Sequence, residues 1–272
     1  MARVSTRLLI VSAGVSLALL GPAAVGEAAP STTAAAEPAV TATVAAIPAA
    51  AVVKPVVSSA WQSCSATLDG VTTWVARTQR TVTMVNQTSK TWARVSFWVR
   101  KESSACAFDR KFLTKKARLG YGRTVEGTKR KQGTGTTPRG AYRMSEAFGN
   151  GSAPTTAMPF HVVKKGDYWV GDNASTYYNS LRNKSQGGFR WKLGSSSINS
   201  SEYLPSYTSQ YRYSVVINFN RAPDYRKTYR GTGIFLHVKG SGATGGCVGV
   251  SKDQMKMVLR YMQPGDKIKI VS

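Results

Sequence analysis

Cys247 and His237 lie in one short stretch of the sequence, IFLHVKGSGATGGCVGVS, whose residue types suit nucleophilic catalysis. A cysteine nucleophile needs a base or a cation that lets it react as a thiolate, and imidazole is a base suited to neutral pH. The histidine ends an apolar run, and a flexible segment joins it to the cysteine ten positions later. We therefore predict Cys247 as the nucleophile of an acyl transfer and His237 as its base.

Structural roles are open for both residues, because a free cysteine also behaves as a small core hydrophobe and a strand-end histidine can serve a structural hydrogen bond. The glycines of 240–246 favour catalysis, since they allow tight turns and leave backbone N–H groups free to face a ligand. We expect the N–H groups of Gly246 and Cys247 to form an oxyanion hole. No Asp or Glu can be assigned as the group that orients His237, and a backbone carbonyl is an alternative. The other histidine, His161, has no nucleophile near it in sequence.

The chain has three cysteines. In an oxidising compartment an odd count leaves one thiol unpaired or paired between chains. Cys64 and Cys106 flank one β-rich region, so we predict a disulfide between them and a free thiol at Cys247.

The N-terminus has the features of an export signal. Arg3 and Arg7 precede an apolar run, Leu8–Leu20, and small residues follow. We predict a signal peptide over 1–28, with an uncleaved anchor as the alternative. The run is shorter than the about 20 residues that span a bilayer, so we expect no stable membrane span after cleavage and a secreted, cell-wall location.

Residues 29–60 are mostly Ala, Pro, Val and Thr, which predicts a disordered tether. The net charge of +24 attracts polyanions. For an exported chain we expect anionic cell-wall polymers as partners and no nucleic acid, because no helix-turn-helix or zinc pattern is present. A well-solvated basic surface is the alternative. With no CxxC or HExxH motif, we expect no metal site.

Polarity patterns predict a mainly β (α+β) fold. The region 61–116 alternates in several segments, as half-buried strands do, and reads either as a small module or as the first strands of one larger sheet. Further strands are expected at 213–219 and 233–238, and a hairpin over 160–170. The polar segment 172–209 reads as a long loop system, which is often a binding loop or a lid.

A single late helix is expected after the cysteine. Ser251 and Gln254 match the N-cap and N3 positions of a capping box. The helix should run to about Met262 with an apolar face, and a Pro-Gly-Asp turn should lead into a last strand at 267–271.

These features in order resemble the L,D-transpeptidase (YkuD-type) catalytic domain of bacterial peptidoglycan enzymes, over about residues 117–272. They are a Thr137-Pro138-x-Gly140 turn entering a strand, a histidine ending a strand, a [ST]-x-Gly-Cys motif, the following helix and the turn before the last strand. The resemblance implies a β-sandwich-like mixed sheet, no cofactor, and Cys247 and His237 as nucleophile and base. It also implies that Thr244 and Gly245 lie where substrate binds.

The implied reaction is attack of Cys247 on the third, L-centred residue of a stem tetrapeptide, with loss of D-Ala. The thioester then passes to an amine of a neighbouring stem, giving a 3→3 cross-link, or to water. The chain departs from the family pattern at two positions: Gly245 replaces a usual histidine and Gly249 a usual arginine.

Two other functions remain open. The departures and the basic charge favour a catalytically silent wall-binding protein of the same fold. A sortase-like cysteine acyltransferase is the other, although such enzymes usually place histidine far upstream of the cysteine.

Overall fold

The structure, a computed structural model, describes residues 53–272. The expected signal peptide and the expected tether up to residue 52 lie outside these residues. The remaining stretch of that tether, 53–60, is hydrogen-bonded to the folded part, for example from Val56 N–H to Gln263 Oε1 at 2.8 Å. Within the described residues no helix combines the length and the apolar character needed to cross a membrane.

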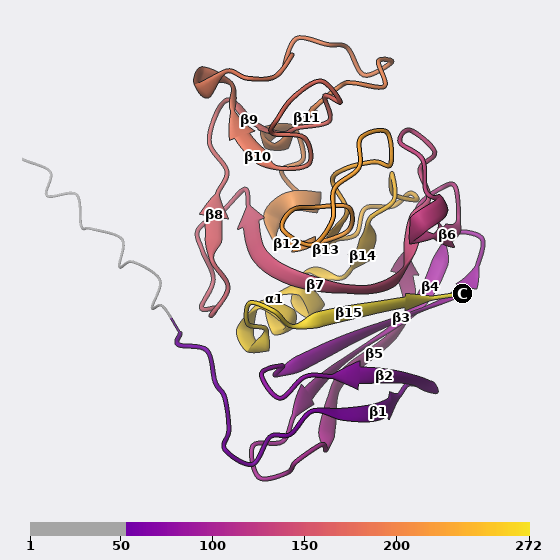
Figure 1. The fold of residues 1–272 in the computed structure, drawn as a ribbon, viewed down its shortest axis with the longest axis vertical. Coiled ribbons are helices and arrows are strands. Elements are labelled where there is room, and N and C mark those ends of the chain that lie inside the picture. The colour runs from indigo at the N-terminus through magenta and orange to yellow at the C-terminus, as the bar shows by residue number, and fades with distance from the viewer. Residues whose placement is uncertain (1–52) are drawn as a thin grey trace, which may run out of the picture. The chain divides into compact units, whose positions relative to one another are not determined.

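A ten-stranded mixed sheet dominates the fold (Figure 1). Its strands are β3 (Thr81–Ser89), β4 (Trp92–Arg100), β5 (Phe108–Arg118), β6 (Thr124–Glu126), β7 (Thr137–Gly149), β8 (Phe160–Val162), β12 (Ser214–Ile217), β13 (Phe235–Val238), β14 (Val248–Val250) and β15 (Lys267–Val271). The order is β12-β13-β14-β5-β4-β3-β15-β7-β6, with β8 beside β7. The predicted mainly β fold class is confirmed.

The long strand β7 closes this sheet on itself. Its first half, Gly140–Arg143, pairs with β15, and its second half pairs with β12, at the other end of the strand order. Figure 1 shows β7 curving to reach both partners. The closure turns the inner face into one enclosed core.

The helix α1 (Lys252–Tyr261) contributes to that core. Ser251 and Gln254 form the predicted capping box, and Met255, Val258 and Leu259 are buried. These side chains pack in one cluster with residues of the surrounding strands, among them Val95 of β4 and Leu236 of β13. The helix therefore fixes the segment that follows Cys247 against the sheet.

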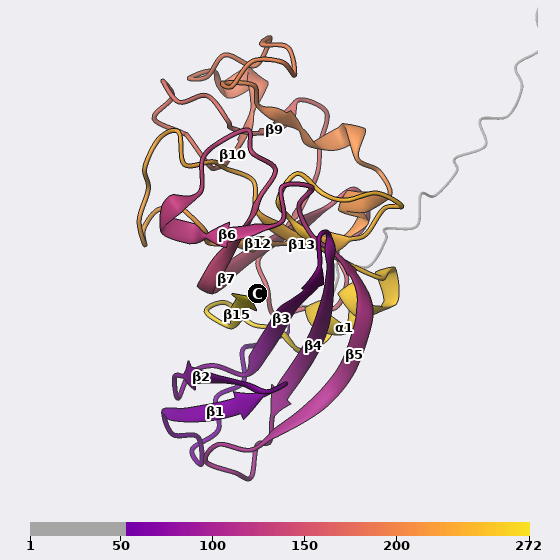
Figure 2. The same ribbon diagram turned by 90° about the vertical axis from the view of Figure 1, so that its right-hand side faces the viewer.

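Strands β3, β4 and β5 belong to the main sheet, and the boundary expected at 116/117 falls inside β5. Figure 2 shows the three running side by side. A separate hairpin, β1 (Cys64–Leu68) with β2 (Val71–Val75), packs its apolar side chains against Val82 and Met84 of β3.

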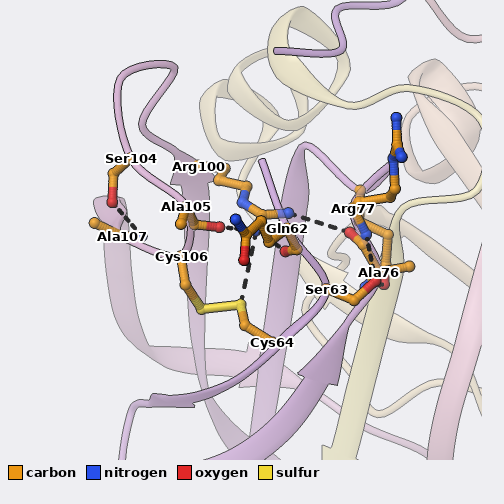
Figure 3. Close-up of a disulfide and its surroundings, with 11 residues drawn as sticks. Gln62, Ser63, Cys64, Ala76, Arg77, Arg100, Ser104, Ala105, Cys106 and Ala107 are labelled. Atoms are coloured by element: carbon orange, nitrogen blue, oxygen red, sulfur yellow. Dashed lines mark hydrogen bonds between the residues drawn. A yellow bond between two sulfur atoms is a disulfide. The ribbon is translucent and has the colours of Figure 1, made fainter. Parts of the chain in front are cut away.

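The predicted disulfide between Cys64 and Cys106 is confirmed, with the two Cα atoms 6.2 Å apart. Beside it lies the buried guanidinium of Arg100, which donates to the carbonyl oxygens of Gln62 and Ala105 (Figure 3). The disulfide and Arg100 together tie the chain entering β1 to the loop between β4 and β5.

The expected hairpin over 160–170 is wrong, because its two arms join different sheets. β8 pairs with β7, whereas β9 (Asp167–Trp169) pairs with β10 (Leu181–Asn183) and β11 (Glu202–Tyr203). The Asp167 carboxylate accepts the Lys164 N–H and bonds His161, which closes the turn without a strand ladder. The arms are therefore free to diverge.

Four short 3-10 helices complete the described elements: η1 (Gly127–Lys129), η2 (Lys184–Gln186), η3 (Leu204–Ser206) and η4 (Gln210–Arg212). The segment 172–209 holds β10, β11, η2 and η3, so it is more ordered than the loop system expected there.

Candidate active site

The register of two parallel strands positions the predicted catalytic pair. In the ladder between β13 and β14, Leu236 is opposite Val248 and His237 is opposite Gly249. Cys247 directly precedes β14 and so stands level with Phe235, two residues before His237. Parallel connections usually need a dozen residues or more, and here 239–247 makes the return. The glycines predicted to bend this segment allow so short a connection.

Cys247 and His237 line the same cavity of about 390 Å³. Its walls come from the glycine-rich loop, from β13 and from the segment around β11 and η4. The lining residues are Glu202, Tyr207, Gln210, Tyr211, Thr232, Gly233, His237, Gly240, Ser241, Gly242, Ala243, Thr244, Gly245 and Cys247.

Cys247 is a free thiol, as predicted, and its side chain is buried. Its Sγ donates to the Gly233 carbonyl and accepts from the Phe235 N–H, both at 3.3 Å. Burial, and next the carboxyl of Glu202, raise the pKa of Cys247 to about 12, against the smaller opposing effects of the Phe235 N–H and Arg130. The Cys247 side chain is therefore a neutral thiol at rest, and its hydrogen bonds do not include the imidazole.

His237 is buried on the same side of the cavity. Its Nδ1 lies 2.8 Å from the carbonyl oxygen of Val238. Because a carbonyl only accepts, Nδ1 carries the ring proton and Nε2 is the basic nitrogen. Burial lowers the pKa of His237 to about 4, although the carbonyls of Val238 and Gln210 oppose this. The imidazole is thus neutral at physiological pH, and a backbone carbonyl orients it, which was one of the sequence-based options.

Thr244 anchors the glycine-rich loop. Its N–H donates to Leu119 O and its carbonyl accepts from Tyr121 N–H, both at 2.9 Å. Its hydroxyl donates to the Cys247 carbonyl at 2.7 Å and accepts the Gly246 N–H at 3.2 Å. Thr244 lines the cavity as expected of a substrate-contacting residue, but its polar groups are engaged within the protein.

The same contacts bear on the expected oxyanion hole. The Gly246 N–H is directed at the Thr244 hydroxyl, so it must give up that bond before it can donate to an oxyanion. Gly246 has φ +133°, and a Cβ there would lie 2.8 Å from the carbonyl oxygen of Thr136. This close approach requires glycine, and it holds the backbone leading to Cys247 in place.

The two departures from the family pattern differ sterically. A Cβ on Gly245 would meet nothing within 4 Å, so the space for a side chain at 245 is open. A Cβ on Gly249 would lie 2.9 Å from Cβ of Lys239 and 3.5 Å from Cβ of Arg118. Two basic side chains therefore already occupy the space beside residue 249, and glycine fits there for a packing reason.

Three ionisable residues that bear on the chemistry of the site were not predicted from the sequence. Glu202 and Tyr211 line the cavity, and the Tyr211 hydroxyl donates to Glu202 Oε1 at 2.6 Å. The Tyr211 ring also packs edge-on against the His237 imidazole, with centroids 5.4 Å apart. Glu202 and Tyr211 both lie more than 30 positions before Cys247 and match no motif, so only the expectation that 172–209 forms binding loops pointed to the Glu202 region.

Arg130 is the third. Its guanidinium is buried, with Nε donating to Thr136 O at 2.7 Å and Nη1 to Arg230 O at 3.0 Å. Burial lowers the pKa of Arg130, and the largest opposing effect comes from Cys247 in its ionised, thiolate form. Arg130 thus brings a positive charge behind the segment that leads to Cys247.

His161 lies outside this site. Its Nε2 is 2.7 Å from Asp167 Oδ2, at a separate cavity of about 240 Å³. Among residues 53–272, no group of three or more His, Cys, Asp and Glu side chains is placed to hold a metal ion.

A mainly β fold that holds a buried thiol and a neutral imidazole in one cavity defines a candidate cysteine acyl-transfer site. The model of the YkuD family, the L,D-transpeptidase catalytic domain, matches residues 94–270, and this chain belongs to that family. The matched region begins inside β4 and contains Cys247, His237 and all the cavity residues.

Three solved structures resemble the chain. They are an L,D-transpeptidase (Yku) from Stackebrandtia nassauensis (14% identity, TM-score 0.30), L,D-transpeptidase 1 from Mycobacterium tuberculosis (13%, 0.31) and an L,D-transpeptidase from Mycobacterium smegmatis (12%, 0.31). The matches cover 71%, 71% and 78% of this chain and 56%, 62% and 67% of those chains. The chain thus spans less than two thirds of the first two structures. No curated protein sequence matched the chain.

Proposed function

We propose that this protein is an exported peptidoglycan L,D-transpeptidase that works through a thioester on Cys247. The observation that carries the proposal is the shared cavity of a free thiol and a neutral, carbonyl-oriented imidazole within the family's catalytic domain. The donor is a stem tetrapeptide, the leaving group is D-Ala, and the acceptor is an amine of a second stem or water.

The first half-reaction begins with a rotation of the Cys247 side chain from the Gly233 carbonyl towards His237 Nε2. Its proton passes to the imidazole as sulfur attacks the donor carbonyl. Since the pKa of the thiol is about 12 and that of the imidazole about 4, a resting thiolate–imidazolium pair is disfavoured. Proton transfer therefore accompanies attack, and the imidazolium then protonates the departing D-Ala amine.

The Cys247 N–H is the expected oxyanion donor, joined by the Gly246 N–H once it leaves the Thr244 hydroxyl. Arg130 supplies a fixed positive charge beside Gly246, the residue before the proposed nucleophile. This charge favours the negative charge that develops during attack.

A wide groove of about 930 Å³ on the outer face of β7 and β15 suits the anionic wall polymers expected as partners. Along β15 the isoleucines are buried, and Lys267 and Lys269 line the groove. Five basic residues and two acidic residues line the groove. The basic ones are Arg139, Arg143, Arg230, Lys267 and Lys269, and the acidic ones are Glu126 and Asp224. The groove is thus a second proposed contact with the wall, apart from the thiol.

Intact-mass measurement with a tetrapeptide donor tests the proposed half-reaction. The wild type should gain the mass of the donor less D-Ala on Cys247. His237→Ala should form this adduct at least 100-fold more slowly, in keeping with general-base catalysis. His161→Ala is the matched control, because its imidazole lies at another cavity, and it should react at the wild-type rate.

The alternative is the catalytically silent wall-binding protein. The resting hydrogen bonds of Cys247, which bypass the imidazole, favour it. A wild type that binds sacculi but forms no thioester would establish that alternative and refute the transpeptidase.

A further inference from the structure

Glu202 introduces a carboxyl group into the cavity of the thiol. It comes from β11, in the 172–209 segment, whereas Cys247 lies at the start of β14. Among the described residues that line the cavity, Glu202 is the one acidic side chain, and neither Lys nor Arg is among them. In a chain with 37 basic and 13 acidic residues, a carboxyl without a cationic partner inside a cavity calls for an explanation.

One oxygen of this carboxyl is free. Oε1 accepts the Tyr211 hydroxyl at 2.6 Å, but within residues 53–272 no hydrogen bond or ion pair reaches Oε2. Oε2 lies on the Gly233 side, 3.5 Å from the position that a Cβ on Gly233 would take. The Gly233 carbonyl is also the acceptor for Cys247 Sγ. The free oxygen and the nucleophile therefore approach the same residue.

This placement does not serve to activate the thiol. A carboxylate near a thiol disfavours the thiolate, and Glu202 is the second cause, after burial, of the raised pKa of Cys247. Nor is the charge of the carboxylate paired: its hydrogen bond comes from the neutral Tyr211 hydroxyl, and a charge in a buried site is costly unless it is paired. A positively charged ligand would remove both penalties at once.

We propose that Glu202 is the acceptor subsite, which binds the ammonium group of a primary amine and takes one proton from it before acyl transfer. This inference rests on the proposed transpeptidase function and specifies its second half-reaction. It identifies the preferred acceptor as an aliphatic primary amine, in place of water.

Transfer of the acyl group to the amine moves two protons. The ammonium group gives one proton to the Glu202 carboxylate and becomes a neutral amine. The amine attacks the thioester carbonyl, the C–N bond forms and the C–S bond breaks. A second proton leaves the nitrogen and reaches sulfur through His237 Nε2, which restores the thiol. The Glu202 carboxyl then returns its proton to solvent.

The pH dependence follows from the ionisation of Glu202. Burial raises the pKa of Glu202 to about 7, although the hydrogen bond from the Tyr211 hydroxyl lowers it. The ionisable groups facing it across the cavity are Tyr207, Tyr211, His237 and Cys247. Only the carboxylate form binds ammonium, so kcat/KM for the amine should rise as pH increases through about 7.

The test separates the two half-reactions in Glu202→Gln, which keeps the shape of the side chain and an acceptor for the Tyr211 hydroxyl. Thioester formation with a tetrapeptide donor should stay within about threefold of wild type, which also shows that the variant is folded. Transfer to a diamino-acid stem peptide should fall at least 10-fold, hydrolysis should persist, and the rise near pH 7 should vanish. Glu102→Gln, at an exposed carboxyl remote from the cavity, should behave as wild type.

Unchanged aminolysis and an unchanged pH profile in Glu202→Gln would overturn the inference and leave the transpeptidase intact. An equal loss of acylation and aminolysis would also overturn it, because the carboxyl would then act on the whole site. A wild type that forms no thioester would instead refute the proposed function on which the inference rests.

Discussion

At the residue scale, the two side chains proposed to react carry no charge at rest. The thiol of Cys247 and the imidazole of His237 are both neutral at rest, because burial disfavours the charged form of each. Reactive cysteines with low pKa values are easily modified by electrophiles. A neutral buried thiol is protected from such side reactions and becomes nucleophilic only as its proton is taken up.

The raised pKa of Cys247 predicts how the rate of its alkylation depends on pH. The rate of iodoacetamide modification of Cys247 should increase steadily with pH beyond pH 9, since the thiolate fraction grows towards a pKa of about 12. In urea-unfolded protein with the disulfide intact, the rate should level off near the ordinary thiol pKa of about 8.5. Mass spectrometry of the alkylated peptide measures both, and a plateau below pH 8 in the folded protein would contradict this account.

Gly245 and Gly249 allow a matched comparison of the two family departures. Gly245→Ala should change the free energy of unfolding by at most about 0.5 kcal/mol, because its Cβ enters open space. Gly249→Ala should destabilise by about 1–3 kcal/mol, because its Cβ meets Lys239 at 2.9 Å.

Urea unfolding of the two variants measures this difference. Equal destabilisation would show that the packing described around residue 249 is not what excludes a side chain there.

The sequence could predict that Cys247 and His237 lie together, because acyl-transfer chemistry leaves few candidates in a chain with three cysteines and two histidines. Glu202, Tyr211 and Arg130 could not. Their roles arise from contacts between distant segments, and a carboxyl, a phenol or a guanidinium has no characteristic spacing from a cysteine.

At the scale of elements, local signals predicted local structure. The capping box of α1 and the alternation of β15 depend on neighbouring residues, and the structure confirms both. The split between β8 and β9 could not be predicted, because a turn sequence does not show which sheet each arm joins. Strand β5 carries basic side chains at several exposed positions, so its sequence does not show a regular alternation of apolar and polar residues.

The disulfide is the element-scale feature with the clearest energetic consequence. Cys64 and Cys106 are separated by 42 positions. The chain entropy of a loop of this length corresponds to about 4 kcal/mol of stability at 25 °C. Cys64→Ser with Cys106→Ser should lower the free energy of unfolding by about that amount.

Urea titration measures the loss in this double variant. Thioester formation on Cys247 in the absence of denaturant should be retained, because the disulfide lies by the β1–β2 hairpin and outside the cavity. A stability change below 1 kcal/mol would contradict the proposed stabilising role.

At the scale of the whole molecule, the candidate catalytic residues and the basic groove lie on two different surfaces. The cavity of Cys247 has an acidic lining residue and no Lys or Arg among its described residues, whereas the outer groove of β7 and β15 is rich in cations. Composition alone suggests an affinity for polyanions, and the outer groove is the location that we propose for it. The sequence could not indicate this location, since basic residues are scattered along the chain.

This division predicts that binding and catalysis can be separated. Lys267→Gln with Lys269→Gln should weaken binding to anionic wall polymer at least threefold at low salt, and 0.5 M NaCl should remove most binding by the wild type. Sedimentation with purified sacculi measures binding. Acylation by a small tetrapeptide should be unchanged, and unaltered binding by the double variant would place the contact elsewhere.

The most direct test of the central claim, that Cys247 forms a thioester with a stem peptide, is muropeptide analysis of purified protein incubated with disaccharide-tetrapeptide. The wild type should release D-Ala and yield 3→3 cross-linked dimers or tripeptide products, and Cys247→Ala should yield neither. Equal product from Cys247→Ala would contradict the assignment of the nucleophile, and no product from the folded wild type would contradict the activity.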